Sequence, residues 1–506
     1  MRRILIIFTV MVIALTLMFP AAAAAAKEGD GEMPALKTKD YYEDILKREI
    51  QFVSTLAFNN GVIGMFPLAS GGYRNLTLPE IDGVSPDEYR FWPSSKVVPY
   101  FSDSAVLGVI KAAELIGGED NKARLLALNY INWYVDHMNT AESDINGVAG
   151  TVYDYFVFQN STDGRIIELT LHDAYASSYP SNNPYDYDST DSYAAMFLEI
   201  LYDYTRVFDN AFLDGKTKLV DTLINVIMST YVTSIDLTYA KPNYAVCYLM
   251  DNCEVYAGFI AAAKIYDEFY GDDEKAAFAL EKADKIKTAI LGRMWVESSE
   301  VFASSVYTNG KHAAGLDVTE FYPQASSQLF PVLFGLLAPD DPKAITVYNR
   351  FKANFCQDGE KGKDWSAYDV KGMTYPWCIL LRAVVGMKDF TLAQKYIDTI
   401  YKRFIIQGHK DPYYNAESGA MLLSLTALLE FAPAAEKDPE PSSEESGEEV
   451  SSQSQNDNGE SLLSLSPEKG GGKKTTPPWI YAGAGVAVIA AALVVFLVGK
   501  KYHKNS

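Results

Sequence analysis

The sequence is poor in cysteine, histidine and basic residues. Its 506 residues include four Cys and five His, and their spacing matches no zinc-binding pattern. Lys and Arg number 44 against 65 Asp and Glu, which gives a formal net charge of -21 at pH 7. We therefore expect no metal centre, no other cofactor and no nucleic-acid partner. Buried thiols are the expectation for the cysteines, and only Cys247 and Cys253 are close enough in sequence to invite a disulfide.

Long hydrophobic runs are confined to the two ends of the chain. The first follows Arg2 and Arg3 and predicts a secretory signal peptide over residues 1–26. The second predicts a transmembrane helix over 479–499, and the lysines after it predict a cytoplasmic tail over 500–506. The acidic, apolar-poor stretch 434–478 predicts a disordered linker. We expect a single-pass protein of the cell membrane whose large domain, residues 36–432, is extracellular.

Between these ends the apolar pattern predicts about twelve helices. Long, aromatic-rich connections alternate with tight turns such as Asp214-Gly215 and Gly271-Asp272-Asp273. This alternation indicates six helical hairpins, with every long loop on one face. The even-numbered helices are rich in small apolar residues and are expected inside, with amphipathic odd-numbered helices around them. Binding is expected on the long-loop face, where the inner helices begin.

Four short motifs lie at the starts of these elements: 150–155 (Gly-Thr-Val-Tyr-Asp-Tyr), 188–193 (Asp-Ser-Thr-Asp-Ser-Tyr), 251–256 (Asp-Asn-Cys-Glu-Val-Tyr) and 415–419 (Asn-Ala-Glu-Ser-Gly). With them, residues 36 to 432 resemble the six-hairpin glycosidase superfamily. The resemblance implies an all-α fold, the (α/α)6 toroid, and a site at the inner-helix N-termini where carboxylates act and aromatic rings stack on sugars. Toroids of this kind include hydrolases, polysaccharide lyases and sugar epimerases, so the resemblance transfers no acid or base to a numbered position.

Glycoside hydrolysis needs a carboxylic acid that protonates the leaving oxygen and a second carboxylate that acts as nucleophile or base. We predict Glu254 as the acid, because Val255 and the nearby tyrosines could raise its pKa, and Asp191 as the base, because a helix N-terminus favours the ionised form. Asp154 and Asp188 are alternative catalytic residues. The competing interpretation is helix capping, and the spacing of Asp251 and Glu254 is that of a capping box. Further acids at this face are Glu320 and Glu417.

Aromatic side chains with a polar group are suited to the apolar face of a sugar, although each could equally serve packing. The predicted substrate-binding residues are Asp251 and eight aromatic residues: Trp92, Tyr153, Tyr185, Tyr256, Trp365, Tyr375, Trp377 and Tyr414. His172 beside Asp173 could be a catalytic pair, but a hydrogen-bonded loop histidine is the simpler interpretation.

The sequence thus predicts a membrane-anchored glycoside hydrolase that acts on an external oligo- or polysaccharide without a cofactor. One alternative is a lyase or epimerase on the same fold, for which the loops offer few basic residues beyond Arg74, Arg90 and Arg165. The other is a non-catalytic surface glycan-binding protein. The sequence does not distinguish the hydrolase from the binding protein, because capping and catalytic carboxylates look alike.

Overall fold

The computed structural model describes residues 36–70, 78–116, 121–176, 178 and 185–434. The chain divides into two units, Met1–Ala35 and Leu36–Ser506, and all described residues belong to the second. The predicted signal peptide, transmembrane helix and cytoplasmic tail lie outside the described residues, as does the predicted linker from residue 435 onward. No helix in the described ranges combines the length and the apolar character needed to cross a bilayer.

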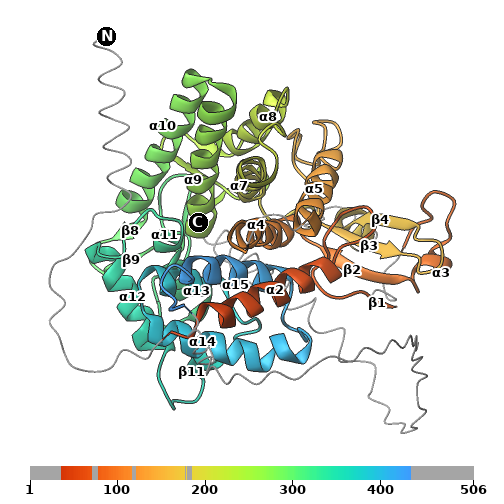
Figure 1. Cartoon of the computed structure of the whole chain (residues 1–506). Coiled ribbons are helices and arrows are strands. Elements are labelled where there is room, and N and C mark those ends of the chain that lie inside the picture. The colour runs from red at the N-terminus through yellow and green to blue at the C-terminus, as the bar shows by residue number, and fades with distance from the viewer. Residues whose placement is uncertain (1–35, 71–77, 117–120, 177, 179–184, 435–506) are drawn as a thin grey trace, which may run out of the picture. The chain divides into compact units, whose positions relative to one another are not determined.

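Six inner helices form a closed ring. Each contacts the next, and the last contacts the first: α4 (Pro99–Leu115), α7 (Thr190–Phe208), α9 (Leu249–Lys264), α11 (Phe330–Leu333), α13 (Ile379–Gly386) and α15 (Asn415–Leu428). Six outer helices precede them in alternation: α2 (Lys39–Thr55), α5 (Asn121–Asp136), α8 (Thr217–Met228), α10 (Asp273–Ala289), α12 (Pro342–Phe355) and α14 (Phe390–Arg403). Figure 1 shows the outer helices arranged around the inner ring. This is an (α/α)6 toroid, which confirms the predicted hairpin order.

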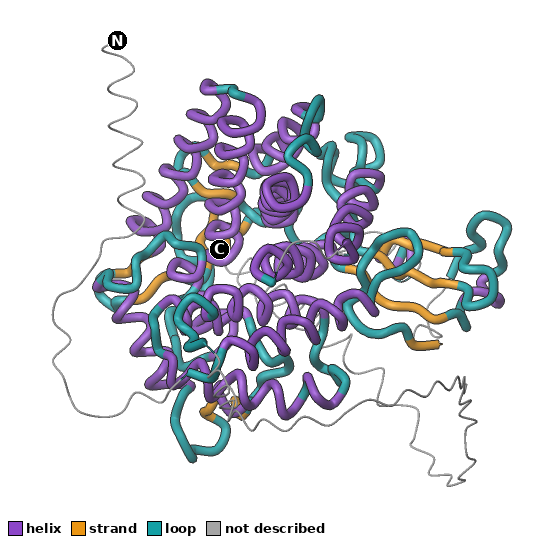
Figure 2. Tube along the Cα trace, in the orientation of Figure 1, coloured by secondary structure: helices purple, strands orange, loops and turns teal. Residues whose placement is uncertain are grey.

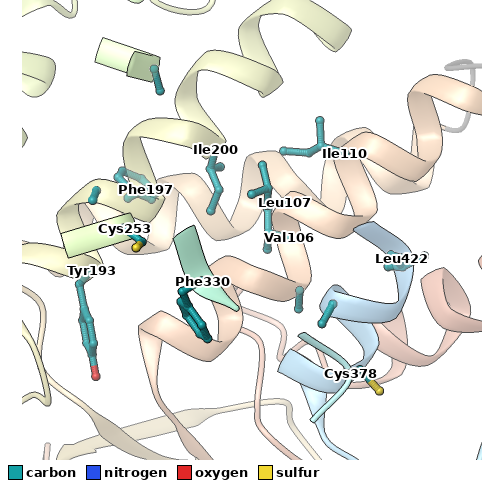
Figure 3. Packing of buried hydrophobic residues seen from close by; sticks show 14 of the residues in the cluster. Val106, Leu107, Ile110, Tyr193, Phe197, Ile200, Cys253, Phe330, Cys378 and Leu422 are labelled. Atoms are coloured by element: carbon teal, nitrogen blue, oxygen red, sulfur yellow. The ribbon is translucent and has the colours of Figure 1, made fainter. Parts of the chain in front are cut away.

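The two sets of helices differ in how much of their surface is buried. The inner helix α4 buries almost every residue from Ser102 to Ala113, whereas the outer helix α14 buries one stripe at three- and four-residue spacing, from Leu392 to Ile400. Apolar residues of the inner helices fill the space between them (Figure 3). All four cysteines are free thiols, so Cys247 and Cys253 do not pair.

Glycine allows the ring to close. A Cβ atom on Gly419 of α15 would lie 2.2 Å from the carbonyl oxygen of Ser104 on α4, and one on Gly108 would lie 2.6 Å from the carbonyl oxygen of Gly419. The α7 and α9 helices meet similarly, because a Cβ on Gly258 would lie 2.6 Å from the Cβ of Ala195. The inner helices approach one another so closely at these glycines that a Cβ atom would not fit. This close approach explains why the inner helices are rich in small residues.

The all-α prediction is wrong for the first two long loops. They form an antiparallel sheet in the order β1 (Ala69–Ser70), β2 (Pro93–Val97), β3 (Tyr155–Gln159) and β4 (Ile166–Thr170), which lies to one side of the helices (Figure 2). Two short helices flank it, α3 (Pro86–Tyr89) and α6 (Leu171–Tyr175). Together they enclose a second, smaller core that contains Tyr89, Trp92 and Phe158.

The other long loops contain short two-stranded ladders: β5 (Tyr231–Val232) with β6 (Leu237–Thr238), β7 (Val246–Tyr248) with β10 (Ser305–Tyr307), β8 (Trp295–Val296) with β9 (Val301–Phe302), and β11 (Lys363–Asp364) with β12 (Asp369–Val370). The eighth predicted helix is also shorter than expected. It consists of a turn of π-helix at Phe321–Ala325 and the short α11, where Pro331 lacks the N–H that a continuous helix would need.

Candidate functional site

The N-termini of the inner helices meet at one end of the ring. The hydroxyl of Tyr100, at the start of α4, donates a hydrogen bond of 2.5 Å to Oε1 of Glu254 on α9. The rings of Phe101 and Tyr414 lie 5.0 Å apart, which brings α4 beside the start of α15. Trp377, just before α13, contacts Tyr322 at 4.9 Å. Loops far apart in sequence therefore contribute to a single face, as expected for parallel inner helices.

Asp191 is part of the N-terminal cap of α7. The N-cap Ser189 accepts a hydrogen bond from the backbone N–H of Ser192, and Oδ1 of Asp191 accepts from the Ser189 hydroxyl at 2.5 Å and from the Ser192 N–H at 3.0 Å. Asp191 has no exposed surface, and its Oδ2 has no hydrogen-bond partner within the described structure. Capping thus accounts for one of its two oxygens only.

The capping-box interpretation of Asp251 and Glu254 is wrong. Tyr248 is the N-cap residue of α9 and makes no side-chain cap, so Asp251 lies inside the first turn and Glu254 one turn further along. Both carboxyl groups face the α7 carboxylates instead. Burial raises the pKa of Glu254 to about 8, and the neighbouring carboxylates of Asp191 and Glu199 add to the effect.

The pKa of Asp251 is also raised well above its ordinary value, first by burial and then by the carboxylates of Asp191, Glu254 and Asp188. Burial raises the pKa of Asp191 to about 6, although its bond from Ser189 opposes the change. Carboxyl groups that interact this strongly titrate as a group, and some of them keep a proton at neutral pH.

Exposure divides the four carboxyl groups into two layers. Asp188 is exposed and Asp251 is half-buried, whereas Glu254 is 1% exposed and Asp191 is fully buried. Only the outer layer, Asp188 and Asp251, can touch a ligand without rearrangement. The predicted acid and base, Glu254 and Asp191, both lie in the inner layer.

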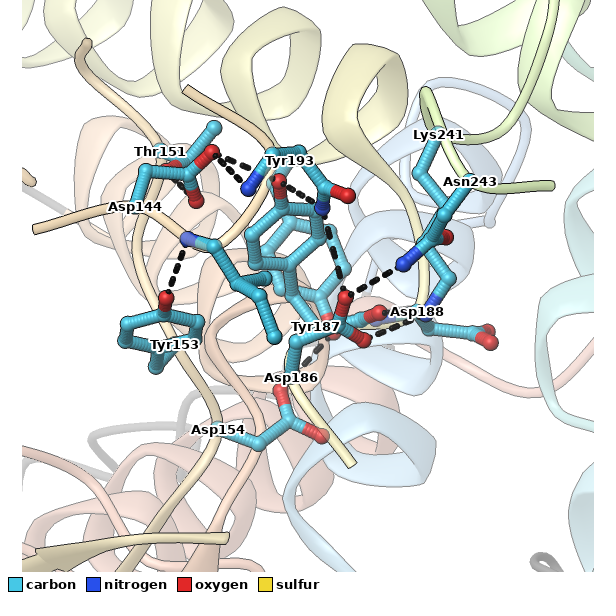
Figure 4. Close-up of polar contacts among 12 residues, drawn as sticks. Asp144, Thr151, Tyr153, Asp154, Asp186, Tyr187, Asp188, Tyr193, Lys241 and Asn243 are labelled. Carbon is cyan, nitrogen blue, oxygen red and sulfur yellow. Dashed lines mark hydrogen bonds and ion pairs between the residues drawn. The ribbon is translucent and has the colours of Figure 1, made fainter. Parts of the chain in front are cut away.

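Asp154 approaches the group from the side of the sheet. Its Oδ1 accepts a hydrogen bond of 2.9 Å from the hydroxyl of Tyr193, and Lys96 Nζ lies 3.8 Å from its Oδ2. Burial raises the pKa of Asp154 to about 7, against the opposing influence of Lys96. Figure 4 shows Asp154 and Asp188 near Tyr193.

Three of the predicted aromatic residues lie at the same end of the ring. Tyr375 contacts Tyr414 at 4.9 Å, and Trp377 contacts Tyr322, whose own pKa is raised by burial and by the carboxylates of Asp188, Asp251 and Glu254. Trp377 and Tyr322 are partly exposed. Tyr322 lies close enough to the carboxylates to flank a ligand bound there, with Trp377 packed against it.

The other five predicted aromatic residues make their contacts elsewhere. Trp92 belongs to the small core of the sheet, and Trp365 is fully buried against Tyr396, with ring centroids 3.9 Å apart. Tyr256 lies beneath Lys287 of α10, Tyr153 donates to the carbonyl oxygen of Ser143, and Tyr185 stacks on Tyr175 at 4.2 Å. Trp365 in particular offers no surface to a sugar.

The remaining candidates, Glu417, Asp173, His172 and Glu320, make other contacts or lie in exposed loops. Glu417 caps α13, because it accepts the backbone N–H groups of Trp377 at 3.0 Å and Cys378 at 2.6 Å. Thr170 caps α6, because its hydroxyl accepts from the backbone N–H of Asp173 and donates to the Asp173 carboxylate, and the ring of His172 stacks on Tyr153. Glu320 is exposed in its loop.

Two small gaps in the packing lie among the described residues. One lies behind the start of α7, beside Thr190 and Val226, the other lies beside α12, and neither has room for a water molecule. Neither is lined by Asp188, Asp251 or Glu254. The candidate site is therefore defined by its chemical groups rather than by an empty cavity.

No family model matches the chain, and no curated protein matches its sequence. Matching solved structures include a wild-type glycosidase (13% identity, TM-score 0.48, 78% of this chain and 98% of that chain). A D-mannose isomerase matches at 9% identity and a TM-score of 0.48, over 78% of this chain and 99% of that chain. A cold-adapted family 8 xylanase matches at 11% identity and a TM-score of 0.46, over 78% of this chain and 93% of that chain. These matches are distant similarities of the backbone fold, and they transfer neither activity nor residue roles. The closed ring of helices establishes the fold.

The sequence-based prediction did not include three tyrosines that lie at the site. Tyr100, Tyr193 and Tyr322 are brought to the carboxylates by the ring, and in sequence Tyr100 is 154 residues from its partner Glu254. A signal did exist for Tyr193, which lies on the same motif as Asp188. For Tyr322 the only signal was its position in the fourth long loop.

Proposed function

We propose that this chain is a glycoside hydrolase that acts on an oligo- or polysaccharide by carboxylate catalysis. The observation that carries the proposal is the two-layered group of carboxyl groups at one end of the ring. In it an exposed carboxylate, Asp188, lies near the half-buried Asp251, whose pKa is raised well above its ordinary value, and the ring of Tyr322, which contacts Trp377, lies near both.

Asp251 is the proposed proton donor. Its raised pKa favours the protonated form, and its partial exposure allows an oxygen atom to reach a glycosidic oxygen. Asp188 is the proposed nucleophile or base, because it is the exposed carboxylate of the group. Glu254 and Asp191 lie behind them, and the Asp191 carboxylate is the largest neighbouring charge that raises the pKa of Asp251.

The two alternative functions differ in what they require. A lyase that acts on uronates needs cationic groups beside the carboxylates. Arg90 pairs with Asp87, and Arg165 pairs with Asp163 and lies over Trp92, both within the sheet region. Arg74 lies outside the described residues. A non-catalytic glycan-binding protein would keep the aromatic face but not release product.

A reducing-end assay with the full-length chain in mild detergent tests the proposal, against a panel of neutral, acidic and amino-sugar glycans, with binding recorded in parallel. Asp251→Asn should lower kcat by roughly 100-fold or more while glycan binding remains. Asp340→Asn, the same change in an exposed turn, is the matched control and should match the wild type.

Three results would contradict the proposal. Tight binding without product would indicate a binding protein, an unsaturated product would indicate a lyase, and full activity of Asp251→Asn would remove that residue from the mechanism.

We also propose that the enzyme is extracellular and anchored in the cell membrane, on the strength of the apolar runs at its two ends. Digestion of intact cells with an added protease should then release the domain.

A further inference from the structure

Tyr193 connects two acidic residues that come from different parts of the chain. It lies near the start of α7 and is 2% exposed. Its hydroxyl donates a hydrogen bond of 2.9 Å to Oδ1 of Asp154 and accepts one of 3.3 Å from the backbone N–H of Asp188 (Figure 4). One buried oxygen atom thus joins a carboxylate beside the sheet to the main chain of the exposed carboxylate.

Asp154 is held in place by contacts of both its main chain and its side chain. Its backbone N–H donates to the carbonyl oxygen of Asp186 at 3.0 Å, and its carbonyl oxygen accepts from the N–H of Leu171 at 2.8 Å. Lys96, on the adjoining strand β2, lies 3.8 Å from Oδ2. With both backbone groups and both side-chain oxygens engaged, Asp154 has little freedom to move.

The ring of Tyr193 also supports the inner carboxylate. It stacks on Tyr100 with centroids 6.0 Å apart and planes inclined by 27°, and the Tyr100 hydroxyl donates to Glu254. Tyr193 is therefore connected to both layers. Its hydroxyl accepts from the backbone of Asp188, and its ring packs on Tyr100, which donates to Glu254.

We propose that Tyr193 is a positioning residue, which ties the backbone of Asp188 to Asp154 and so aims the Asp188 carboxylate at the substrate. The inference rests on the proposed function, in which Asp188 is the nucleophile or base. It gives Asp154 the role of an anchor rather than that of a catalytic group.

A pH dependence follows from this arrangement. The groups that face Asp154 are Lys96, Tyr193, Asp188 and Lys241, and burial, the largest influence, raises its pKa to about 7. Above that pH the ionised carboxylate accepts the Tyr193 hydrogen bond. Below that pH, Asp154 is protonated and accepts the Tyr193 hydrogen bond less strongly. Tyr193 then holds the backbone of Asp188 less firmly. Activity should therefore rise with pH through about 7.

Three variants of the full-length chain test the inference. Tyr193→Phe should lower kcat by roughly 10- to 100-fold with little change in KM, and the rise of activity near pH 7 should disappear. Asp154→Asn is neutral at every pH, like protonated Asp154, so kcat at pH 8 should fall only to the level that the wild type has at low pH, and the rise near pH 7 should be lost. Tyr266 is also 2% exposed, and its hydroxyl donates to the Asp221 carboxylate at 2.7 Å. This pair lies away from the site, so Tyr266→Phe should leave the kinetics unchanged.

Crystal structures of the wild type and Tyr193→Phe at pH 8 provide a readout that does not need activity. A displaced Asp188 with the rest of the ring unchanged supports the inference, and an unmoved Asp188 overturns it. Loss of kcat in Asp154→Asn as large as in Asp251→Asn would also overturn it, by making Asp154 catalytic. If the wild type cleaves no glycan, the proposed function fails, and the position of Asp188 still decides the role of Tyr193.

Discussion

Replacement of Glu254 by Gln should make the protein more stable at pH 8 and have little effect at pH 5. The ordinary pKa of a glutamate is 4.5, and burial raises that of Glu254 to about 8. Between these values the folded chain holds a proton that the unfolded chain has released. The free energy of unfolding therefore falls as the pH rises through this window.

The size of the effect follows from the same pKa. A tenfold change in proton affinity is worth about 1.4 kcal/mol, so the penalty at pH 8 is about 4 kcal/mol. For a domain of about 400 residues this corresponds to roughly 5 °C in Tm. Gln keeps the size of Glu254 and an oxygen that can accept from Tyr100, but it cannot ionise, so the variant escapes the penalty.

Thermal unfolding of the full-length chain at pH 5 and pH 8 measures this directly. Other buried acids also give the wild type a pH slope, so the informative quantity is the difference in Tm between variant and wild type at each pH. Glu430→Gln, the same change at an exposed position near the end of α15, should track the wild type. If Glu254→Gln shows the same difference at both pH values, or is less stable than the wild type at pH 8, Glu254 does not hold a proton in the folded protein and the reasoning fails.

Two further predictions concern the ring and the aromatic face. Gly419→Ala should destabilise by about 1–3 kcal/mol, because its Cβ meets backbone atoms of α4, whereas Gly292→Ala, with open space around the Cβ, should be neutral or stabilising in the same denaturant titration. Trp365→Ala should cost about 3–5 kcal/mol of stability and leave the glycan affinity of the folded protein unchanged. Trp377→Ala should weaken glycan binding by roughly 3- to 10-fold in a calorimetric titration, and equal losses of affinity in both Trp variants would contradict the placement of these rings.

The helical hairpins could be predicted because each depends on residues close together in sequence. The apolar run of α4 and the single buried stripe of α14 are local patterns, and the tight turn at Gly271 is a local signal as well. The hairpin of β3 and β4 also had a local signal, since two runs rich in aromatic and β-branched residues flank Asp163 and Gly164. Its pairing with β2 had none, because Lys96 and Phe156 meet only when two separate loops fold together.

The candidate site shows the same division. The sequence by itself determined that acidic and aromatic residues stand at the starts of the inner helices, because capping chemistry and apolar periodicity mark those starts. Asp188 and Asp191 are three residues apart and alike in type, yet one is exposed and the other fully buried. Only the tertiary structure decided this, together with the partnership of Tyr100 with Glu254 and the burial of Trp365. Burial and long-range contacts set the pKa and the accessibility of a side chain, and they depend on which distant segments pack around it.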